Sequence, residues 1–358
     1  MNGLKHYFKT PETYTGMMLA MAFQLILFFV WMTAYNGVND RLENLKVAVI
    51  NQDHSVGTSL AKQLNDSLPF TVVEQTSLEI SHNQMNMRNW DMIVTIPTDF
   101  SKQMQEKGTA NLEFYINQST ATLGKSIMES AAKQFTTEVN HQLNNKGIVG
   151  NIIKTNEVAG FTPTMIPLMV ILASFVGAML MSLQLNIATK KLQNSTGKWD
   201  LFLSRLVINF ISSSLSATIT LLFFFIFGVE LTQSVLITWL FQALILFTFL
   251  VVTQMSLIVL GKVGPYFNIF LLATQLVTSG AIVPRALLTE PYQLVGNYLP
   301  ATYGAEGYFN LIFGGGNLVQ DFKMIFAILI ISLVVTTGKI AYSNKLVKAL
   351  VARTALVK

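Results

Sequence analysis

The order of apolar and polar segments constrains the fold of this chain more than any motif does. One apolar segment, residues 15–35, is followed by a mostly polar block, residues 36–162. Five more apolar segments follow, at residues 164–188, 205–228, 234–260, 266–283 and 322–342. Each is close to the roughly 20 apolar residues with which a helix crosses about 30 Å of hydrocarbon. The order predicts an α-helical membrane protein with six transmembrane helices (1+5) and a domain inserted after the first. It excludes an ordinary soluble enzyme.

Basic residues gather at the span ends and loops that alternation places on one side of the membrane. They are Lys5, Lys9, Lys190, Lys191, Lys198, Arg205, Lys262, Lys339, Lys345, Lys348, Arg353 and Lys358. Only Glu12 and Asp200 are acidic on that side. The positive-inside rule then predicts that both termini are cytoplasmic, with a basic tail at 343–358, and that the polar block is extracytoplasmic. The net charge of +5 therefore reflects topology and does not indicate a nucleic-acid partner.

The chain contains no cysteine, which excludes disulfides, thiolate metal sites and cysteine nucleophiles. An extracytoplasmic domain without disulfides favours a multi-pass protein of a bacterial plasma membrane. The first apolar segment is too long for a signal-peptide core and lacks a small-x-small cleavage site at its outer end, so we expect a retained first helix.

The polar block alternates between β-rich runs and helical stretches, which predicts a small α/β domain. We expect strands at residues 46–51, 70–73, 90–96 and 112–116. Helices are expected from a Ser55 cap through Leu64, after a cap at Thr98 or Asp99, and over residues 119–144, the last leading back to the membrane.

No constellation in this domain predicts catalysis, a cofactor or a metal. Gly124-Lys125-Ser126 resembles the end of a phosphate-binding loop, but Ser119 stands where that motif needs a glycine. The three histidines of the block (His54, His82 and His141) have no metal-ligand spacing. The domain is therefore interpreted as a binding or gating module.

The predicted spans are nearly free of charge, which argues against an ion-coupled transporter. They do contain weakly polar residues, which permit close helix packing or line a path for an amphipathic substrate. The sequence leaves both interpretations open. The candidates for path lining are Gln184, Ser213, Gln254, Gln275 and Thr278.

Three further segments stand out. The first 14 residues mix basic and aromatic side chains (Lys5, Tyr7, Phe8 and Lys9), as a cytoplasmic interfacial helix does. The predicted cytoplasmic loop at 189–200 carries Lys190, Lys191, Lys198, Trp199 and Asp200, and serves either as a positive-inside anchor or as a partner contact. Residues 284–320 are apolar but interrupted by proline and glycine, which predicts short interfacial or re-entrant helices on the outer face.

These residues resemble a known family. The run 275–280, then Pro284, residues 299–303 and Gly314-Gly315 together resemble the closing segment of ABC-2 type permeases, most closely the YhgE/Pip-like branch. Residues 47–53 are similar to the opening outer strand of that branch, and residues 167–179 to its second span. The inserted domain is more compact than in the larger members.

The resemblance implies the permease subunit of an ATP-driven exporter, paired with a second permease chain as a homodimer or heterodimer. A separate cytoplasmic subunit would bind ATP and Mg²⁺, because this chain has no Walker motif. The substrate would be amphipathic, such as a lipid, drug, peptide or cell-envelope precursor. Residues 190–200 would form the ATPase-coupling helix and residues 4–9 the elbow helix. The outer gate would include Pro284, Pro300, Tyr303 and Glu306. The alternative is a non-transporting surface receptor or scaffold.

Overall fold

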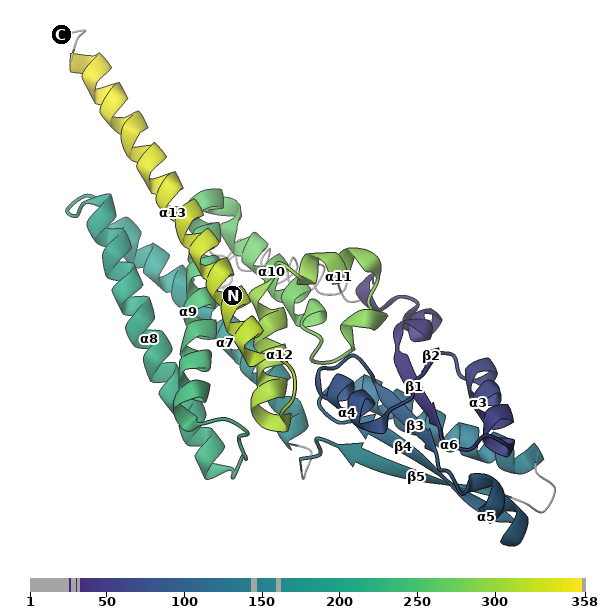
Figure 1. Cartoon of the computed structure of the whole chain (residues 1–358). Coiled ribbons are helices and arrows are strands. Elements are labelled where there is room, and N and C mark those ends of the chain that lie inside the picture. The colour runs from purple at the N-terminus through teal and green to yellow at the C-terminus, as the bar shows by residue number, and fades with distance from the viewer. Residues whose placement is uncertain (1–25, 27–29, 31–32, 143–146, 159–161, 356–358) are drawn as a thin grey trace, which may run out of the picture.

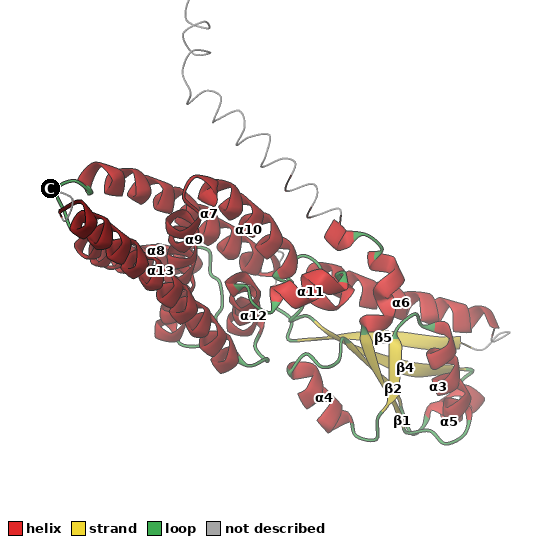
Figure 2. Ribbon diagram, turned by 90° about the horizontal axis from the view of Figure 1, so that it is seen from above, coloured by secondary structure: helices red, strands yellow, loops and turns green. Residues whose placement is uncertain are grey.

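A computed structural model describes Ile26, Val30 and residues 33–142, 147–158 and 162–355. An α/β domain lies at one end of a bundle of long helices (Figures 1 and 2). The predicted elbow helix and most of the predicted first span lie outside the described residues. The described residues between 26 and 35 are helical.

Five strands form one mixed sheet with the order β2-β1-β3-β4-β5. They are β1 Lys46–Asn51, β2 Thr71–Glu74, β3 Met92–Ile96, β4 Thr109–Asn117 and β5 Gly147–Thr155. β1 pairs in parallel with β2 and β3, β4 is antiparallel to β3, and β5 is parallel to β4. The four predicted strands are confirmed to within a few residues.

β5 was not predicted, because it begins with Gly147 and Gly150 interrupts its apolar run. Glycine is needed at position 150, since a Cβ there would overlap Thr136 of the helix that crosses the strand. Glycine inside a strand marks such a close approach. The prediction that the helix at 119–144 leads back to the membrane was therefore wrong: that helix leads into β5, and β5 precedes the bundle.

Helices cover both faces of the sheet. They are the 3-10 helix η1 Val38–Asn44 and the α-helices α3 Val56–Ser67, α4 Leu78–Asn86, α5 Phe100–Glu106 and α6 Thr122–Gln142. Leu64 of α3, Met104 of α5 and Phe135 of α6 share one apolar core, whereas Met85 of α4 packs with Ile50 on the other face. α4 was not predicted.

Asp53, rather than Ser55, caps the start of α3. Ser55 occupies the N-cap position, but its side chain accepts no capping hydrogen bond. The Asp53 carboxylate accepts the Ser55 and Gly57 backbone N–H groups at 3.0 Å each. Asp99 likewise precedes α5 without a capping bond and instead accepts from the Gln103 side chain. The starts of both helices were predicted, but not the capping at either.

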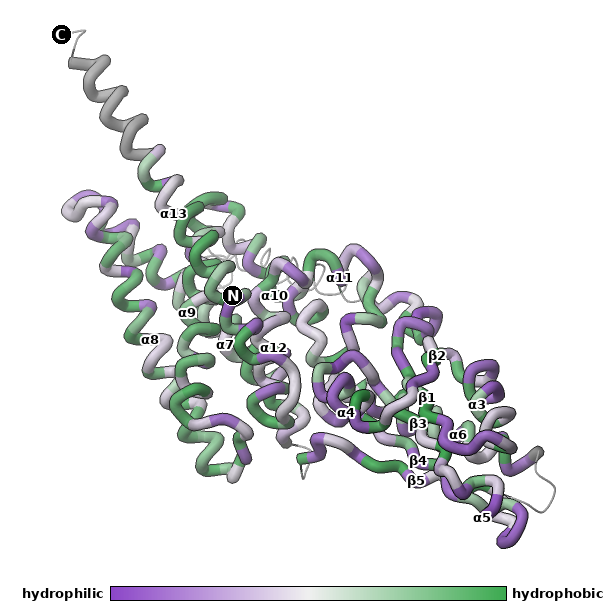
Figure 3. The backbone as a smooth tube through the Cα atoms, viewed as in Figure 1, coloured by the Kyte–Doolittle hydropathy of each residue, from purple (hydrophilic) through white to green (hydrophobic). Residues whose placement is uncertain are grey.

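The bundle consists of α7 Thr162–Leu192, α8 Lys198–Ile226, α9 Val235–Leu260, η2 Gly261–Val263, α10 Gly264–Thr278, η3 Arg285–Leu287, α11 Glu290–Gly296, α12 Pro300–Phe313 and α13 Leu318–Ala355. Within the described residues, four helical runs are long and apolar enough to cross a membrane: Pro163–Leu192, Lys198–Ile226, Val235–Thr278 and Leu318–Tyr342. Figure 3 shows apolar residues along these helices and hydrophilic ones over the α/β domain.

The predicted fifth span, residues 266–283, is shorter than expected. α10 has 15 residues, about 22 Å of helix, and ends at Thr278, where Gly280 (φ 75°) and then Pro284 prevent its continuation. α9 and α10 together count as one membrane-length run. The total of six spans stays a prediction.

The predicted loop at residues 189–200 is mostly helical. α7 continues through Leu192 and α8 begins at Lys198, so only a five-residue turn separates them. We call residues 189–200 the tip. Figures 1 and 2 place the tip at the end of the molecule away from the α/β domain.

The chain between α10 and α13 (residues 279–317, hereafter the linking segment) enters the bundle rather than lying on it. α12 has 14 residues, about 21 Å, and twelve of them are buried. Gly304 and Gly307 do not break this helix. They admit Ile171 of α7 and Phe241 of α9, which a Cβ at either position would overlap. The prediction of a re-entrant helix is consistent with this burial.

Candidate functional site

Arg285 organises the linking segment. Its guanidinium lies 3.4 Å from the Glu306 carboxylate of α12 and donates to the Gln293 carbonyl of α11 at 3.2 Å and to Asn297. Tyr303 donates to the Asn297 carbonyl at 2.7 Å. Two of the predicted gate residues, Tyr303 and Glu306, therefore belong to one polar cluster that joins η3, α11 and α12.

The other two predicted gate residues are buried prolines. Pro284 lies against Gly124 of α6, where a Cβ would overlap the proline ring. Pro300 occupies the first turn of α12, where its missing N–H costs no helical hydrogen bond. The structure thus places all four predicted gate residues in the linking segment. Their role as a gate stays a prediction.

Arg88 connects the α/β domain to this segment. It donates to Asn310 Oδ1 of α12 at 2.5 Å, to the Glu306 carbonyl at 3.4 Å and to Ser119 Oγ at 3.2 Å. Asn310 donates in turn to Asp321 Oδ2 of α13 at 2.7 Å. Burial lowers the pKa of Arg88, while Glu306 and Asp321 oppose that shift. One hydrogen-bonded chain therefore runs from the domain through α12 to α13.

A glycine triplet supplies the second connection. Gly314, Gly315 and Gly316 all have positive φ (77°, 73° and 64°), a region that glycine adopts without steric cost. The turn brings Gly316 N–H within 2.7 Å of the Asn86 carbonyl at the end of α4. Ser119 Oγ donates to the Gly314 carbonyl at 3.2 Å. Here the linking segment lies against the domain backbone to backbone.

Lys125 of α6 forms a third connection. Its ammonium lies 4.7 Å from the centre of the Phe313 ring at the end of α12. The side chain is buried, and Nζ has no hydrogen-bond acceptor among the described residues. Burial lowers the pKa of Lys125 to about 8, with Glu129 opposing the shift and Lys154 adding to it. The sequence Gly124-Lys125-Ser126 is therefore helical, and its lysine contacts the bundle.

The first helix and η1 hold the far side of the segment. Arg41 donates to the Leu287 carbonyl at 2.8 Å, and Asn44 donates to the Ala286 carbonyl at 2.9 Å. Thr33 Oγ1 and the Tyr292 hydroxyl lie 2.6 Å apart. The apolar core of the domain also continues without interruption into α10 and η3, through residues such as Val277 and Leu287. The domain is therefore docked firmly on the linking segment.

A cavity of about 280 Å³ remains between the domain and the segment. Charged groups line it from both sides, Arg88 and Asp91 from the domain and Arg285 and Glu306 from the segment. Burial raises the pKa of Asp91 to about 6, although the Lys46 N–H donates to its carboxylate at 2.9 Å.

Four of the five predicted path residues are packed inside the bundle. Gln254 is buried and its Nε2 donates to Asn209 Oδ1 at 2.8 Å, and Gln275 Oε1 accepts the Ala301 N–H at 3.1 Å. Ser213 and Thr278 donate to carbonyls of their own helices. Gln184 is exposed on α7. These contacts are those of helix packing, and path lining stays a prediction.

A different polar group lies beside the lateral cavities of the bundle. Tyr308 of α12 donates to Gln242 at 2.6 Å, and Gln242 donates to Ser174 of α7 at 3.1 Å. Two adjoining cavities of about 280 and 260 Å³ lie between α7 and α8, and Ser174 and Thr220 line both. None of the five predicted path residues lines them. Sequence inspection noted the serines and threonines but could not pair α7 with α8.

The tip residues are exposed. Lys190 and Lys191 lie in the last turn of α7, and Lys198, Trp199 and Asp200 form the first turn of α8. Cations at a helix C-terminus and an acid at an N-terminus both complement the helix dipole. The predicted elbow residues Lys5, Tyr7, Phe8 and Lys9 lie outside the described residues.

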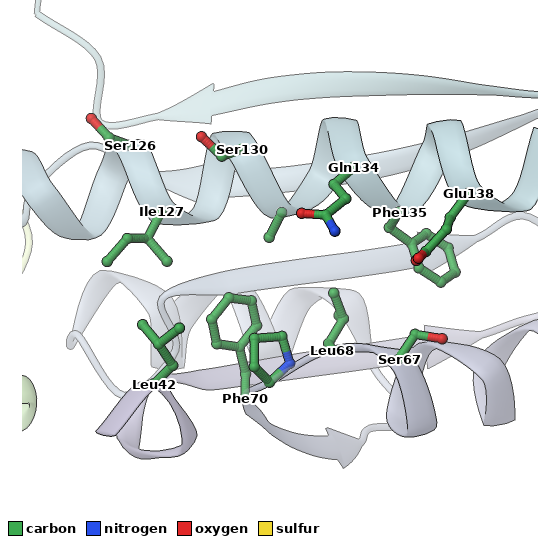
Figure 4. Close-up of a pocket in the computed structure, with 12 residues that line it drawn as sticks. Leu42, Ser67, Leu68, Phe70, Ser126, Ile127, Ser130, Gln134, Phe135 and Glu138 are labelled. Atoms are coloured by element: carbon green, nitrogen blue, oxygen red, sulfur yellow. The ribbon is translucent and has the colours of Figure 1, made fainter. Parts of the chain in front are cut away.

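Another cavity, of about 480 Å³, is a groove on the α/β domain between α6 and the turn before β2. Figure 4 shows Leu42, Phe70 and Ile127 facing its interior, with Gln134 and Glu138 along the α6 side. No predicted site residue lines it. Within the described residues, no group of three histidine, cysteine or carboxylate side chains is placed to hold a metal.

Several membrane-length helices, with the shorter buried helix α12 among them, are typical of an integral membrane protein. The chain belongs to the ABC-2 family of transporter proteins: a family model described as ABC-2 family transporter protein matches residues 14–338. Among solved structures, it is similar to a crystallised domain assigned to an ABC type-2 transporter of Thermotoga maritima. That similarity has 18% identity and a TM-score of 0.23, and it covers 30% of this chain and 86% of that chain. No curated protein sequence matches the chain. Its placement in the YhgE/Pip-like branch stays a prediction.

Proposed function

We propose that this chain is the membrane subunit of an ATP-driven exporter that moves an amphipathic substrate and is powered by a separate ATP-binding subunit. The α/β domain lies outside a bacterial plasma membrane, and the tip and the C-terminal end of α13 lie in the cytoplasm. The family membership supports the transporter class. The distribution of basic residues supports the orientation.

The observation that carries the proposal is the form of the tip. The end of α7, the short turn and the start of α8 form an exposed helix–turn–helix with three lysines. It lies at the end of the molecule opposite the α/β domain. Both helices are longer than a membrane crossing requires, with 31 and 29 residues. A rigid projection of this kind transmits movement of a bound ATPase into α7 and α8, whereas a flexible loop would absorb it.

The linking segment is the outer gate in this proposal. It is held by polar contacts from the first helix, η1, the domain and α13, and by apolar packing on the domain core. Movement of α7 reaches it directly, because Ile171 of α7 packs on Gly304 of α12.

The substrate path forms between two copies of the permease in this proposal. Inside one chain, the polar groups of Gln242, Gln254 and Asn209 bond to one another or to neighbouring helices. The lateral cavities between α7 and α8 open at the side of the bundle, where a second chain or lipid lies.

Affinity purification of the full chain in mild detergent tests the proposal. We expect an ATP-binding subunit to co-purify in fixed stoichiometry. The triple variant Lys190→Glu, Lys191→Glu, Lys198→Glu should lose that subunit, because charge reversal repels the surface that the lysines contact. Lys262→Glu changes an exposed lysine on the same side and is the matched control. Retention of the ATPase by the triple variant would reject the coupling role. Absence of any ATPase from the unaltered protein would favour the surface-receptor alternative.

Orientation has its own test, because the chain has no cysteine. Asp66→Cys in the domain and Asn194→Cys in the tip both place a thiol at an exposed position. A membrane-impermeant maleimide should label only the first in intact cells and both after lysis. Labelling of Asn194→Cys in intact cells would reverse the proposed topology.

A further inference from the structure

Arg205 is a buried cation for which the described residues provide no counter-charge. It lies on α8 seven positions after Lys198, and only 6% of its surface is exposed. Its Nη1 reaches Thr189 Oγ1 at 3.5 Å, at the limit of a hydrogen bond. Its Nε and Nη2 have no hydrogen-bond partner among the residues that the structure describes. A buried guanidinium in this state is costly, because its charge is removed from water without compensation.

The arginine faces a cavity rather than packed protein. A space of about 360 Å³ lies where the ends of α7, α8 and α9 meet the middle of α13, and Arg205 lines it. Lys198 and Lys339 contribute two more cations to the lining, and Gln193 and Asn194 contribute amide groups. No aspartate or glutamate lines the cavity among the described residues.

Near the cavity, the described part of the chain offers little to neutralise this charge. Residues 343–358, which follow Lys339 along the chain, contain no aspartate or glutamate and add four basic residues. Asp200 lies close in sequence, but its carboxylate is directed toward Gly197 at the start of α8. The cavity therefore has a positive potential and a guanidinium with two free donor atoms.

The remaining walls are apolar. Leu201 and Phe202 of α8, Ile258 of α9 and Ile340 of α13 complete the lining. A cationic recess with apolar walls fits a molecule with an anionic head and hydrocarbon tails. A soluble anion would leave the apolar walls unused.

We propose that Arg205 and Lys339 bind the phosphate of an acidic phospholipid from the inner leaflet, which sits as a resident ligand between α7, α8 and α13. The phosphate diester accepts charge-assisted hydrogen bonds from Arg205 Nε and Nη2, a planar pair of donors suited to two phosphate oxygens. The lipid joins helices on both sides of the tip, and so stabilises the part of the bundle that would meet the ATPase.

The proposal depends on the proposed function only for the leaflet and for the effect on the ATPase. Lipid binding itself is measured on the purified chain without any partner. Loss of ATPase co-purification with intact lipid binding would overturn the proposed function alone. Intact ATPase binding without lipid selectivity would overturn the lipid site alone.

Native mass spectrometry of the full chain in detergent tests the site, with phosphatidylglycerol, phosphatidylcholine and inorganic phosphate as the probes. We expect phosphatidylglycerol to bind at least about tenfold more tightly than phosphatidylcholine, with no competition from millimolar phosphate. Arg205→Gln should weaken phosphatidylglycerol binding about tenfold or more, as expected for the loss of charge-assisted hydrogen bonds, and Arg205→Lys should restore part of it. Full competition by free phosphate would assign the site to a soluble anion and overturn the lipid source.

Variants of two exposed lysines distinguish a loss of lipid binding from a failure to fold. Lys339→Gln removes a cavity cation and should weaken phosphatidylglycerol binding several-fold, whereas Lys262→Gln removes a cation outside the cavity and should not. Equal binding by the unaltered chain, Lys339→Gln and Arg205→Gln would overturn the proposal. This comparison holds even when Arg205→Gln fails to fold, because an unaffected Lys339→Gln would then reject the cavity as the lipid site.

Discussion

Arg88 and Asn310 are 222 positions apart in the chain, and their side chains meet at 2.5 Å between Nη2 and Oδ1. Arg88 follows α4 with a positive φ of 63°, which a residue with a side chain rarely adopts. Such backbone geometry persists only where the surrounding contacts require it. Here the left-handed turn directs the guanidinium toward α12, and Asn310 in turn donates a hydrogen bond to Asp321. The α/β domain and the bundle are therefore mechanically connected at a point that the sequence does not reveal.

Removal of the Arg88 side chain should weaken this connection. Arg88→Ala leaves Asn310 Oδ1 without its donor, and we expect the free energy of unfolding to fall by about 2 kcal/mol. Hydrogen exchange should increase at Asn86 and at Gly314–Gly316, where the linking segment lies against the domain. Lys102→Ala is the control. Lys102 Nζ lies 4.0 Å from the Glu106 carboxylate and both side chains are exposed, so the loss of this ion pair should cost under about 0.5 kcal/mol. Equal effects of the two variants would contradict the assignment.

Gly307→Ala should destabilise the bundle through overpacking. A Cβ at Gly307 would overlap the Phe241 ring, and we expect a loss of about 1–3 kcal/mol in thermal unfolding measured in detergent. Phe241→Leu should recover part of that loss in the double variant. Gly177→Ala provides the comparison, since no atom lies within 4 Å of a Cβ there, and its effect should stay within about 0.5 kcal/mol. If Gly177→Ala were the more harmful change, the packing of α12 would differ from the one described.

Hydropathy and local pattern predicted most individual elements. The strand at 46–51 was predicted to the residue, because a continuous apolar run bounded by a turn has few alternatives. The spans were located, but their ends were not: α7 and α8 extend past the hydrocarbon on polar residues, which a hydropathy window cannot follow. The glycines at 304 and 307 were included among the interruptions of the segment at 284–320, although both lie inside α12. Glycine also serves close packing between helices, and a sequence pattern does not separate the two uses.

The contacts between distant segments were out of reach. Arg88, Asn310 and Asp321 lie in three different elements, and no spacing rule relates them. Lys125 was examined as part of a phosphate-loop motif and set aside, because nothing local indicates Phe313 as its neighbour. The irregular segment that contains the predicted gate residues was located, because proline and glycine mark irregular backbone directly. Path lining depends on how chains associate, and one sequence does not contain that information.

Lys125 should make stability depend on pH in the alkaline range. Its pKa is about 8 in the folded protein and near 10.5 when solvated, so the unfolded chain binds more protons between these values. Stability should therefore rise as the pH increases from about 8 to 10.5. Lys125→Met should raise the free energy of unfolding at pH 7 by about 1–3 kcal/mol and abolish this rise. Thermal unfolding at pH 7 and pH 10 measures both the stability at neutral pH and its rise with pH. A Lys125→Met protein that is less stable than the unaltered protein at pH 7 would mean that the contact with the Phe313 ring contributes more than burial of the charge costs.

Asp53 should contribute stability that is lost in acid. Burial raises the pKa of Asp53, but bonds from Ser101 Oγ and from the Gly57, Ser101 and Ser55 N–H groups together lower it to about 2, against 3.8 when solvated. The contribution is complete above about pH 4 and disappears as the pH falls toward 2. Asp53→Ala should cost about 1–2 kcal/mol at pH 7, detected as faster hydrogen exchange in α3 and α5. Asp66→Ala, at an exposed position near the end of α3, should leave exchange unchanged.

Restraining the linking segment should stop the ATPase cycle if that segment is the outer gate. Asn44 Nδ2 lies 2.9 Å from the Ala286 carbonyl, so cysteines at these two positions are within reach of a short cross-linker across the junction between η1 and η3. No native cysteine competes for the reagent. A short reducible cross-linker should suppress ATP hydrolysis by the purified complex, and reduction should restore it, because a gate that cannot open blocks the conformational cycle. Cysteines at Lys102 and Glu106, cross-linked within α5, control for the chemistry without joining the two parts. Unchanged hydrolysis in the cross-linked Asn44→Cys/Ala286→Cys protein would show that η3 stays in place during turnover. The opening would then have to involve α12. Directly after α12, Gly314–Gly316 provide the only positive-φ backbone between α11 and α13 among the described residues.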